Sequence, residues 1–518
     1  MPLLQAAWKQ FRAFSGYGHE ASYLWPRWLV LRGVGLVYVC IFAGILQEWR
    51  ALVGSQGIAP LARYCALAGD VAPNLFVRVL RVPSLFLVSS DPAVISVLAW
   101  GGLAAALALL LNLWPRFALF ACWAIFLSFV ATWEVFSPTL NDRLMLETAL
   151  LCLPFAPAGL RPGLGAASPP RPITIFMMRW LIIRIMLTAG LAKVLGNDPS
   201  WLGFTFMERM YATSPAPTVL GYYVFHLPHA WHIGETLFTF AAELLAPLLA
   251  LFGGRRGRAI AVGIWTAFQV GIQLTGNFGW LNTAAIALGL LFLDDQMIAA
   301  ALRWLRLGGW AARIAALGLP APARPSMRAV ALGALLWLHF GLTIYFTVTV
   351  LRGQLAPGLP DPLAQPLQFF FRDFRSANCY HLYVSTPPVR DDVEFAGSGD
   401  GGLTWRPYPF RYKPQAEDRM APFLAPRFGR FEATLQIVLD GRLPVSVIPD
   451  TARELVRGNP DVTGLFASNP FPSSPPTQVR MMVYRYTFTD LKTHRETGRY
   501  WHKEYVGEYA LPVAAGRP

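Results

Sequence analysis

Long apolar stretches recur through the first 351 residues, and they constrain the fold more than any other feature of this sequence. Each is close to the roughly 20 residues that an α-helix needs to cross a bilayer. They lie at 29–48, 93–113, 117–136, 174–195, 234–252, 259–275 and 329–351. Two shorter stretches, 144–157 and 281–293, bring the expected number of spans to nine, or to eight if one of them does not cross. The sequence therefore predicts a polytopic α-helical membrane bundle.

The distribution of charge separates a second region from this bundle. Charged residues make up only 14% of the chain, against about 25% in soluble domains. Residues 1–351 contain 24 Lys and Arg and 13 Asp and Glu, whereas the much shorter stretch 352–518 contains 20 and 17. We therefore expect two domains: a transmembrane helical domain over 1–351 and a water-facing domain over 352–518.

The positive charges also indicate an orientation. With nine spans and a cytoplasmic N-terminus, fifteen cations of the membrane region fall on the cytoplasmic side and six on the opposite side, which fits the positive-inside rule. The six are Arg50, Arg63, Arg78, Arg81, Arg143 and Arg209. We expect the C-terminal domain outside the cytoplasm and the first span to act as an uncleaved signal. Since most of the net charge of +14 belongs to the membrane region, we expect no nucleic-acid binding.

The C-terminal part has the alternating pattern of strands. Short strands are predicted at Cys379–Ser385 and Asp392–Ala396, and a further one after a glycine-rich turn at Leu403–Tyr412. Near the end, Val479–Thr489 and Gly498–Tyr509 are expected to pair as a hairpin. The fold class that follows is a helical membrane bundle followed by a mostly antiparallel β domain.

Several strings carry a resemblance to a known family. They are Tyr23–Pro60, Asn141–Glu147, Arg184–Trp201, Gly276–Asp295, Glu394–Pro414 and the C-terminal strings NPFPSSPP, VRMMVYRYTFT and TGRYWHKEYVGEY. In this order, and over nearly the whole chain, they resemble the lipase maturation factor family. The resemblance implies a membrane-anchored maturation factor whose non-cytoplasmic C-terminal domain assists the folding or assembly of secreted lipases or other exported clients, with membrane lipid around its spans and no cofactor.

The composition adds an expectation about the compartment. The chain is rich in Ala, Arg and Pro, which favours a bacterial inner-membrane protein with its C-terminal domain in the periplasm. In a eukaryote the equivalent place is the endoplasmic reticulum membrane. The identity of the client and the oligomeric state are left open.

A second, more distant likeness suggests an enzyme. Ala189–Lys193, followed by Asp198 and Trp201, is similar to the lysine-bearing segment of vitamin K-dependent γ-carboxylase. That likeness implies an alternative function, a membrane enzyme that uses Lys193 as a base on a lipid-soluble substrate. No GxSxG, P-loop, GxGxxG or HExxH pattern occurs, so the common hydrolase, nucleotide and zinc-protease chemistries are not expected.

Ionisable residues within the predicted spans are costly and usually face a partner or a cavity. They are Arg32, Glu147, Arg184, Lys193 and Glu243. In one interpretation Lys193, with Glu147 or Glu243 as counter-ion, lines a polar cavity and acts as a catalytic base. In the other, which we favour, Lys193 extends to the interface and ion pairs hold the bundle together.

Two further sets of residues are candidates for binding. His226, His229 and His232 are spaced like metal ligands, but Pro228 and the rotation between them make three co-facing imidazoles awkward, so no metal site is expected. Aromatic side chains in the tail are candidates for a client-binding face, although core packing should take at least half of the tail's aromatics. The candidates are Trp405, Tyr408, Tyr412, Tyr484, Tyr486 and Trp501.

Cys65 and Cys379 both fall on the non-cytoplasmic side in this topology. An oxidising compartment would allow them to form a disulfide.

Overall fold

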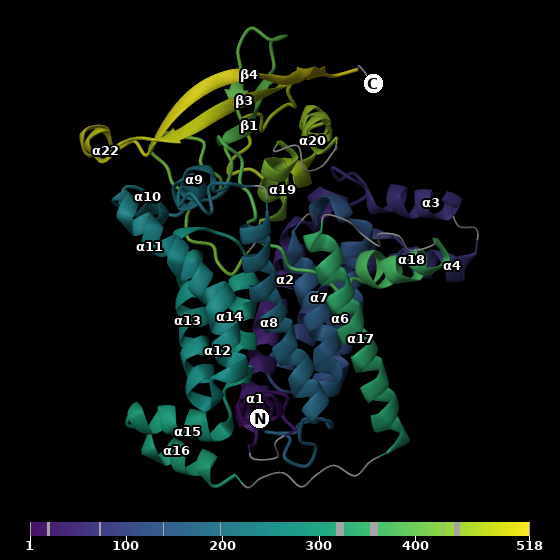
Figure 1. Ribbon diagram of the computed structural model, residues 1–518. Helices are drawn as coiled ribbons and strands as arrows, with labels where there is room; N and C mark the ends of the chain where they lie inside the picture. Colours follow the sequence, from purple (N-terminus) through teal and green to yellow (C-terminus); the bar gives the residue numbers. More distant parts are fainter. Residues whose placement is uncertain are drawn as a thin grey trace.

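The protein is described here from a computed structural model that covers residues 2–17, 21–71, 74–137, 139–196, 198–317, 326–352, 361–427, 429–439 and 446–516. A bundle of helices forms one part, and a sheet with short helices lies across one end of it (Figure 1). We call this the outer end of the bundle, and the opposite end the inner end. The sheet-bearing C-terminal part is thus stacked on the outer end.

The bundle contains every stretch that hydropathy identified, and each is helical. Its elements are α2 (Leu24–Val53), α5 (Pro92–Leu110), α6 (Pro115–Thr132), α7 (Leu140–Phe155), α8 (Pro172–Leu195), α11 (His229–Phe240) continuing through η3 (Ala241–Leu245) into α12 (Ala246–Phe252), α13 (Gly254–Thr275), α14 (Leu281–Gly289) with η4 (Leu290–Phe292), and α17 (Met327–Leu351). At the inner end lie α1 (Pro2–Phe14), α15 (Asp295–Trp304) and α16 (Gly308–Ala315).

Fewer helices meet a span criterion than the nine expected. Six of the described helices are long and apolar enough to cross a membrane, or up to seven when the bent pair Leu281–Phe292 and Asp295–Trp304 is counted as one. α7 is only 16 residues long. α13 contains Arg258, Gln269 and Gln273, which lower its mean hydropathy. The helical membrane region is confirmed, with shorter and more polar helices inside it.

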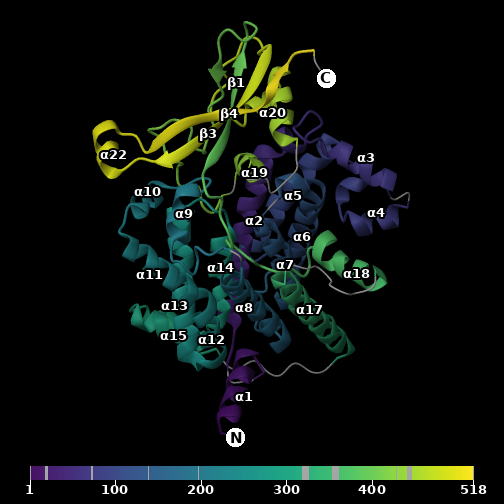
Figure 2. The same ribbon diagram turned by 45° about the horizontal axis from the view of Figure 1, so that its top comes forward.

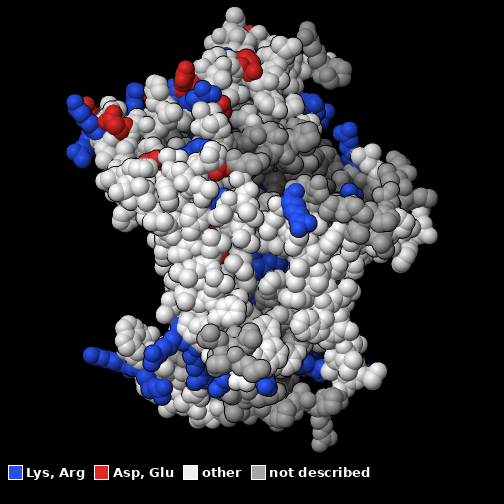
Figure 3. All heavy atoms as spheres, in the orientation of Figure 1, with Lys and Arg blue, Asp and Glu red and all other residues white. Residues whose placement is uncertain are grey.

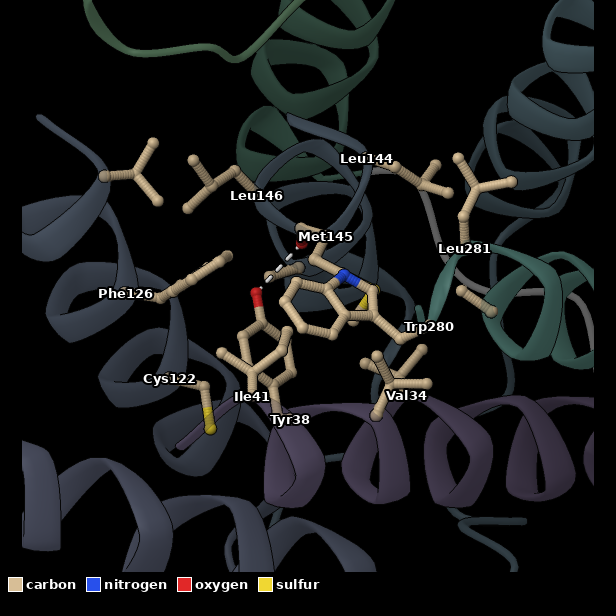
Figure 4. Close-up of a cluster of buried hydrophobic side chains, with 14 of the residues drawn as sticks. Val34, Tyr38, Ile41, Cys122, Phe126, Leu144, Met145, Leu146, Trp280 and Leu281 are labelled. Carbon is tan, nitrogen blue, oxygen red and sulfur yellow. Dashed lines mark hydrogen bonds between the residues drawn. The ribbon is translucent and has the colours of Figure 1, made fainter. Parts of the chain in front are cut away.

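Close packing of large side chains forms the core of the bundle. Tyr38 of α2 is fully buried and donates its hydroxyl to the carbonyl of Met145 in α7 at 2.9 Å (Figure 4). Its ring meets Phe126 of α6 edge-on, with 6.0 Å between the ring centroids. The indole of Trp280, just before α14, lies in the same cluster. Helices from both halves of the membrane region therefore share one core.

Four prolines, at positions 60, 73, 83 and 92, interrupt the apolar stretches of segment 50–92, and from its sequence alone this segment is expected to be a loop or a partly re-entrant element. Its described residues instead form the short helices α3 (Leu61–Val71) and α4 (Leu75–Arg81) and the turn η1 (Leu85–Leu87). Figures 1 and 2 place α3 and α4 beside α18 (Asp361–Gln368) at the outer end of the bundle. They lie across the bundle axis rather than along it.

The C-terminal sheet has the order β2-β1-β3-β4, with all neighbours antiparallel. Its strands are β1 (Asp391–Ser398), β2 (Arg406–Pro407), β3 (Gln478–Phe488) and β4 (Trp501–Ala514). β3 and β4 pair from Phe488 opposite Trp501 to Gln478 opposite Ala514, with three irregularities in register. The predicted terminal hairpin is confirmed, and a short helix, α22 (Leu491–Thr497), closes it.

Other parts of the C-terminal region differ from the prediction. Helices α19 (Arg430–Leu439), α20 (Val447–Val456) and α21 (Pro460–Thr463) lie between the second and third strands, and α19 and α20 pack on the sheet. Of Leu403–Tyr412, only Arg406 and Pro407 belong to a strand. Cys379–Ser385 is not a strand. Its backbone bonds the membrane bundle instead, as described below.

Candidate functional site: the junction between bundle and sheet

Residues 374–390 connect the last bundle helices to β1, and we call them the strap. Alternate carbonyls of the strap accept hydrogen bonds from the outer end of the bundle: Tyr380 from Thr188, Leu382 from Lys193 at 3.0 Å, and Val384 from the Trp201 indole at 3.1 Å. Because the strap lies outside the sheet, its carbonyls need hydrogen-bond partners elsewhere. The strap thus docks through backbone groups.

Glu147 of α7 lies beneath the strap and is fully buried. Its carboxylate pairs with Arg184 of α8. The second oxygen accepts hydrogen bonds from the Asn378 backbone N–H at 3.1 Å and side chain at 2.9 Å, and from the Tyr380 hydroxyl at 2.8 Å. A buried carboxylate needs such partners to offset the loss of water. Glu147 therefore receives three of its hydrogen bonds from the C-terminal region.

Lys193 of α8 is the second buried charge under the strap. Its ammonium lies 2.8 Å from both carboxylate oxygens of Glu243 in η3 and over the Trp201 ring, with 5.1 Å from Nζ to the ring centroid. Lys193 and Glu243 are only 3% and 4% exposed. Glu243 and the Leu382 carbonyl accept hydrogen bonds from this ammonium, and a catalytic role for Lys193 stays a prediction. The geometry supports a structural ion pair.

A third buried pair joins α7 to α19. Arg430 makes two hydrogen bonds of 2.8 Å to the two carboxylate oxygens of Asp142, and both side chains are nearly inaccessible to solvent. The guanidinium also lies over the rings of Trp133 and Trp280, at 4.6 and 5.3 Å. Asp142 therefore serves the junction rather than capping α7. A single arginine in the tail gives no pattern by which this pairing could be predicted from sequence.

A cavity of about 440 Å³ lies at the junction, lined by residues of the bundle, the strap and the C-terminal helices. The bundle contributes Asn277 and Phe278, and the strap contributes the segment 381–387. Burial lowers the pKa of His381 in this wall, and Arg143 lowers it further. Amide, aromatic and backbone groups therefore line this cavity together.

The opposite wall of the cavity is held by Glu432 of α19. Its carboxylate accepts the backbone N–H groups of Arg411, Tyr412 and Lys413 at 2.5–3.2 Å. Burial raises the pKa of Glu432, and these hydrogen bonds oppose that rise. The wall is therefore fixed by backbone contacts, as the strap is on the other side.

Comparison with known proteins agrees with this two-part construction. The family profile described as the lipase maturation factor transmembrane domain matches residues 25–300, and the lipase maturation factor C-terminal domain matches residues 376–512. The chain belongs to the lipase maturation factor family. The second match begins inside the strap and includes β1 to β3 and most of β4, so both sides of the junction are family features.

Curated relatives align over both parts. Mouse lipase maturation factor 1 is 26% identical over 96% of this chain and 88% of its own length. Human lipase maturation factor 1 is 25% identical over 96% and 89%, and rat lipase maturation factor 2 is 24% identical over 95% and 84%. No solved structure matches the chain.

In this member of the lipase maturation factor family, three of the six predicted client-binding aromatics are core residues. Tyr408, Tyr486 and Trp501 are at most 1% exposed. Tyr486 bonds Glu394, and Trp501 stacks on Phe488 with 4.4 Å between centroids. Alternation along a strand does not tell a core face from a binding face, so assigning these three to a client surface was wrong.

The other three aromatic candidates keep partial exposure. Trp405 lies over the Arg480 guanidinium at 4.6 Å, and Tyr484 pairs with Tyr505 of β4 at 5.5 Å. Tyr412 lines the junction cavity. Their part in client binding stays a prediction.

The three histidines do not converge. His226 bonds the carbonyl oxygens of Tyr222 and Thr489, His229 bonds Glu208, and His232 bonds Glu235. No group of three potential ligands lies together among the residues that the structure describes.

The cysteines also remain separate. Cys65 and Cys379 are both free thiols in this structure. Cys65 contacts the Phe86 carbonyl at 3.7 Å, whereas Cys379 is buried in the strap. The disulfide that the predicted topology would allow between them is not formed in this structure.

Proposed function

We propose that this protein assists the maturation of an exported lipase, and that the C-terminal region is the part that meets the client. Family membership over both regions supports a role in lipase maturation. The observation that carries the proposal is the junction: hydrogen bonds of Glu147 and Lys193 to the strap, together with the buried Asp142–Arg430 ion pair, hold the sheet on the outer end of the bundle. Such an arrangement fixes a client-binding sheet at a defined height above the membrane.

The charge distribution supports a non-cytoplasmic position for that sheet. On the face shown in Figure 3, Lys and Arg gather at the inner end, the middle of the bundle is mostly uncharged, and charges of both signs cover the C-terminal part. A positive inner end fits the cytoplasmic side. We therefore place residues 352–518 in the periplasm of a bacterium, with 1–351 as the membrane domain.

The edge strand β4 is our candidate for the client contact. It is the outermost strand of the sheet and most of its residues are exposed, including Tyr505 at 53% and Leu511 at 88%. An exposed edge strand offers unpaired backbone groups to an incoming extended segment. Trp405 and Tyr484 lie on or next to the same sheet and supply aromatic contacts. A partly folded lipase with an unpaired strand fits this surface.

The proposal is tested by deleting the gene in its native host and measuring the specific activity of each exported lipase. We expect at least one lipase to be secreted in inactive form, and activity to return with the wild-type gene. Unchanged activity of every exported lipase would contradict the maturation role.

A paired set of variants tests the client surface. Tyr505→Lys with Leu511→Lys places charges on the β4 edge, which blocks edge pairing, so complementation should fail while the protein level stays normal. Leu403→Lys is the matched control, because Leu403 is 85% exposed in the glycine-rich turn and outside β4. Full complementation by the β4 variant would contradict the assignment of the client contact to β4. The lining of the junction cavity would then be the next surface to substitute.

A further inference from the structure

A second cavity, of about 450 Å³, lies away from the junction between α3, α4 and the turn η5 (Phe369–Asp373). Ala131 of α6 lines its inner wall, so the cavity adjoins a candidate membrane span. Four of its lining residues are arginines, and Asp373 is the one acid among the described residues that line it. The arginines are Arg78, Arg81, Arg372 and Arg375. Arg372 pairs with Asp373 at 3.3 Å, so the lining carries a net positive charge.

The surroundings of the cavity are apolar. Leu75 and Phe76 of α4 are 56% and 69% exposed, and Leu67 of α3 is 57% exposed. Exposed apolar side chains on short helices that lie across a bundle axis are typical of elements at a membrane surface. The cavity thus combines a cationic lining with exposed apolar side chains on the same two helices, at the outer end of the bundle (Figures 1 and 2).

The positions of these arginines are unusual for a membrane protein. Arg78 and Arg81 belong to the six cations that the topology places on the non-cytoplasmic side, where the positive-inside rule disfavours them. Two features of the α3–α4 pair define the position of Arg78. Asn74 caps α4 by accepting the Phe76 N–H at 2.8 Å, and the Arg78 guanidinium lies against Gly69, where a Cβ would approach it to 3.4 Å. The helix pair holds cationic groups toward one cavity.

We propose that this cavity binds the phosphate of an anionic phospholipid from the outer leaflet. Guanidinium groups bind phosphate oxygens in pairs, and the charge of the lining matches a head group with a net negative charge. The acyl chains of the lipid would lie along the exposed apolar side chains of α3 and α4. One bound lipid would seat these two helices on the membrane surface beside the C-terminal region.

Native mass spectrometry of the full-length protein, released from nanodiscs that contain equal amounts of dioleoylphosphatidylglycerol and dioleoylphosphatidylcholine, tests the proposal. We expect one phosphatidylglycerol to be retained preferentially. Arg78→Gln with Arg81→Gln should reduce that retention about tenfold to thirtyfold, since each basic group near the surface contributes to anionic lipid binding. Equal retention of the two lipids by the wild-type protein would overturn the proposal.

The matched control removes the same charge from the inner end. Arg303 of α15 and Arg306 just after it are both exposed, and Arg303→Gln with Arg306→Gln should leave the retained lipid in place. An equal loss in both double variants would show non-specific attraction and would also overturn the proposal. If the α4 double variant does not fold, Arg78→Lys is used in its place. This variant keeps the positive charge but loses the planar guanidinium that makes two parallel hydrogen bonds to a phosphate, so lipid retention should weaken severalfold.

A competition arm separates a lipid from a soluble phosphate compound. Glycerol 1-phosphate carries the head-group chemistry without acyl chains. We expect millimolar glycerol 1-phosphate to leave the bound phosphatidylglycerol in place, because the exposed apolar side chains of α3 and α4 hold the acyl chains. Displacement at that concentration would assign the cavity to a small soluble anion instead.

Discussion

The two ends of the bundle hold buried charge in different ways. At the inner end, Arg27 donates to the carbonyl oxygens of Leu164 and Ser168 at 2.8 and 2.7 Å, both within the membrane region. At the outer end, Asp142, Glu147 and Lys193 each take a partner from beyond residue 370. At the inner end the buried Arg27 finds its partners within the membrane region, whereas at the outer end the buried charges need partners from the C-terminal region. Bundle and sheet therefore stabilise each other. This suits the proposed function, in which the sheet binds a client in a fixed orientation relative to the bundle.

The variant Arg430→Met should show the largest loss of stability among those that test this difference. Removing one partner of a buried ion pair leaves a charge without compensation, which costs about 3–5 kcal/mol. Because Asp142 is fully buried, we expect the variant to unfold at clearly lower temperature in detergent and the C-terminal region to become sensitive to protease. Thermal unfolding with limited proteolysis measures both.

Two further variants serve as controls for Arg430→Met. Arg453→Gln removes an arginine of α20 that is paired to Asp450 near the surface, and exposed pairs contribute only about 0–1 kcal/mol. Asp142→Asn combined with Arg430→Met should recover part of the lost stability, because no buried charge is then left unpaired. A loss equal in the Arg430 and Arg453 variants would refute the idea that the outer end depends on the tail.

Lys193→Met gives the second test, with a smaller effect, since Glu243 retains slight exposure. We expect a loss of about 3–4 kcal/mol, at the lower end of the range of about 3–5 kcal/mol for a broken buried pair. Lys193→Met with Glu243→Gln should be more stable than the single variant and should still complement lipase maturation in the deletion strain. A stable, correctly inserted double variant without maturation activity would instead favour a chemical role for Lys193.

The sequence predicted the structure correctly where a residue pattern has a single physical cause. Runs of about 20 apolar residues arise from a bilayer, and alternation in Val479–Thr489 arises from a strand, so both were identified correctly. The prediction failed for the strap, because Leu382 and Val384 bind through backbone carbonyls that every residue carries. Arg430 was missed for a related reason: its importance comes from Asp142, nearly 300 positions earlier in the chain.

Arg27 provides the third test, at the inner end. Arg27→Met removes three hydrogen bonds to carbonyl oxygens of the segment 164–168. Leaving buried acceptors without donors costs about 1–3 kcal/mol. We expect faster hydrogen exchange in this segment alone, with the strap unchanged. Exchange that also rises in residues 374–390 would show that the two ends are coupled, contrary to the comparison above.

The smallest effect concerns α22, the helix at the end of the hairpin, far from the junction. The Thr493 backbone N–H and hydroxyl donate to the Asp490 carboxylate at 2.8 and 3.0 Å and lower its pKa. Because the folded state has the lower pKa, this stabilisation is present above the unfolded value of about 3.9 and is lost as the pH falls through the folded value. We expect the amide hydrogens of α22 to exchange faster at pH 3 than at pH 6, relative to their intrinsic rates.

The control variant Asp490→Asn keeps a capping side chain without an ionisable group, so the exchange of α22 should not depend on pH in this way. An identical pH response in both proteins would assign the change to other groups of the hairpin, while β4, paired to β3 along its length, should keep its protection in either case.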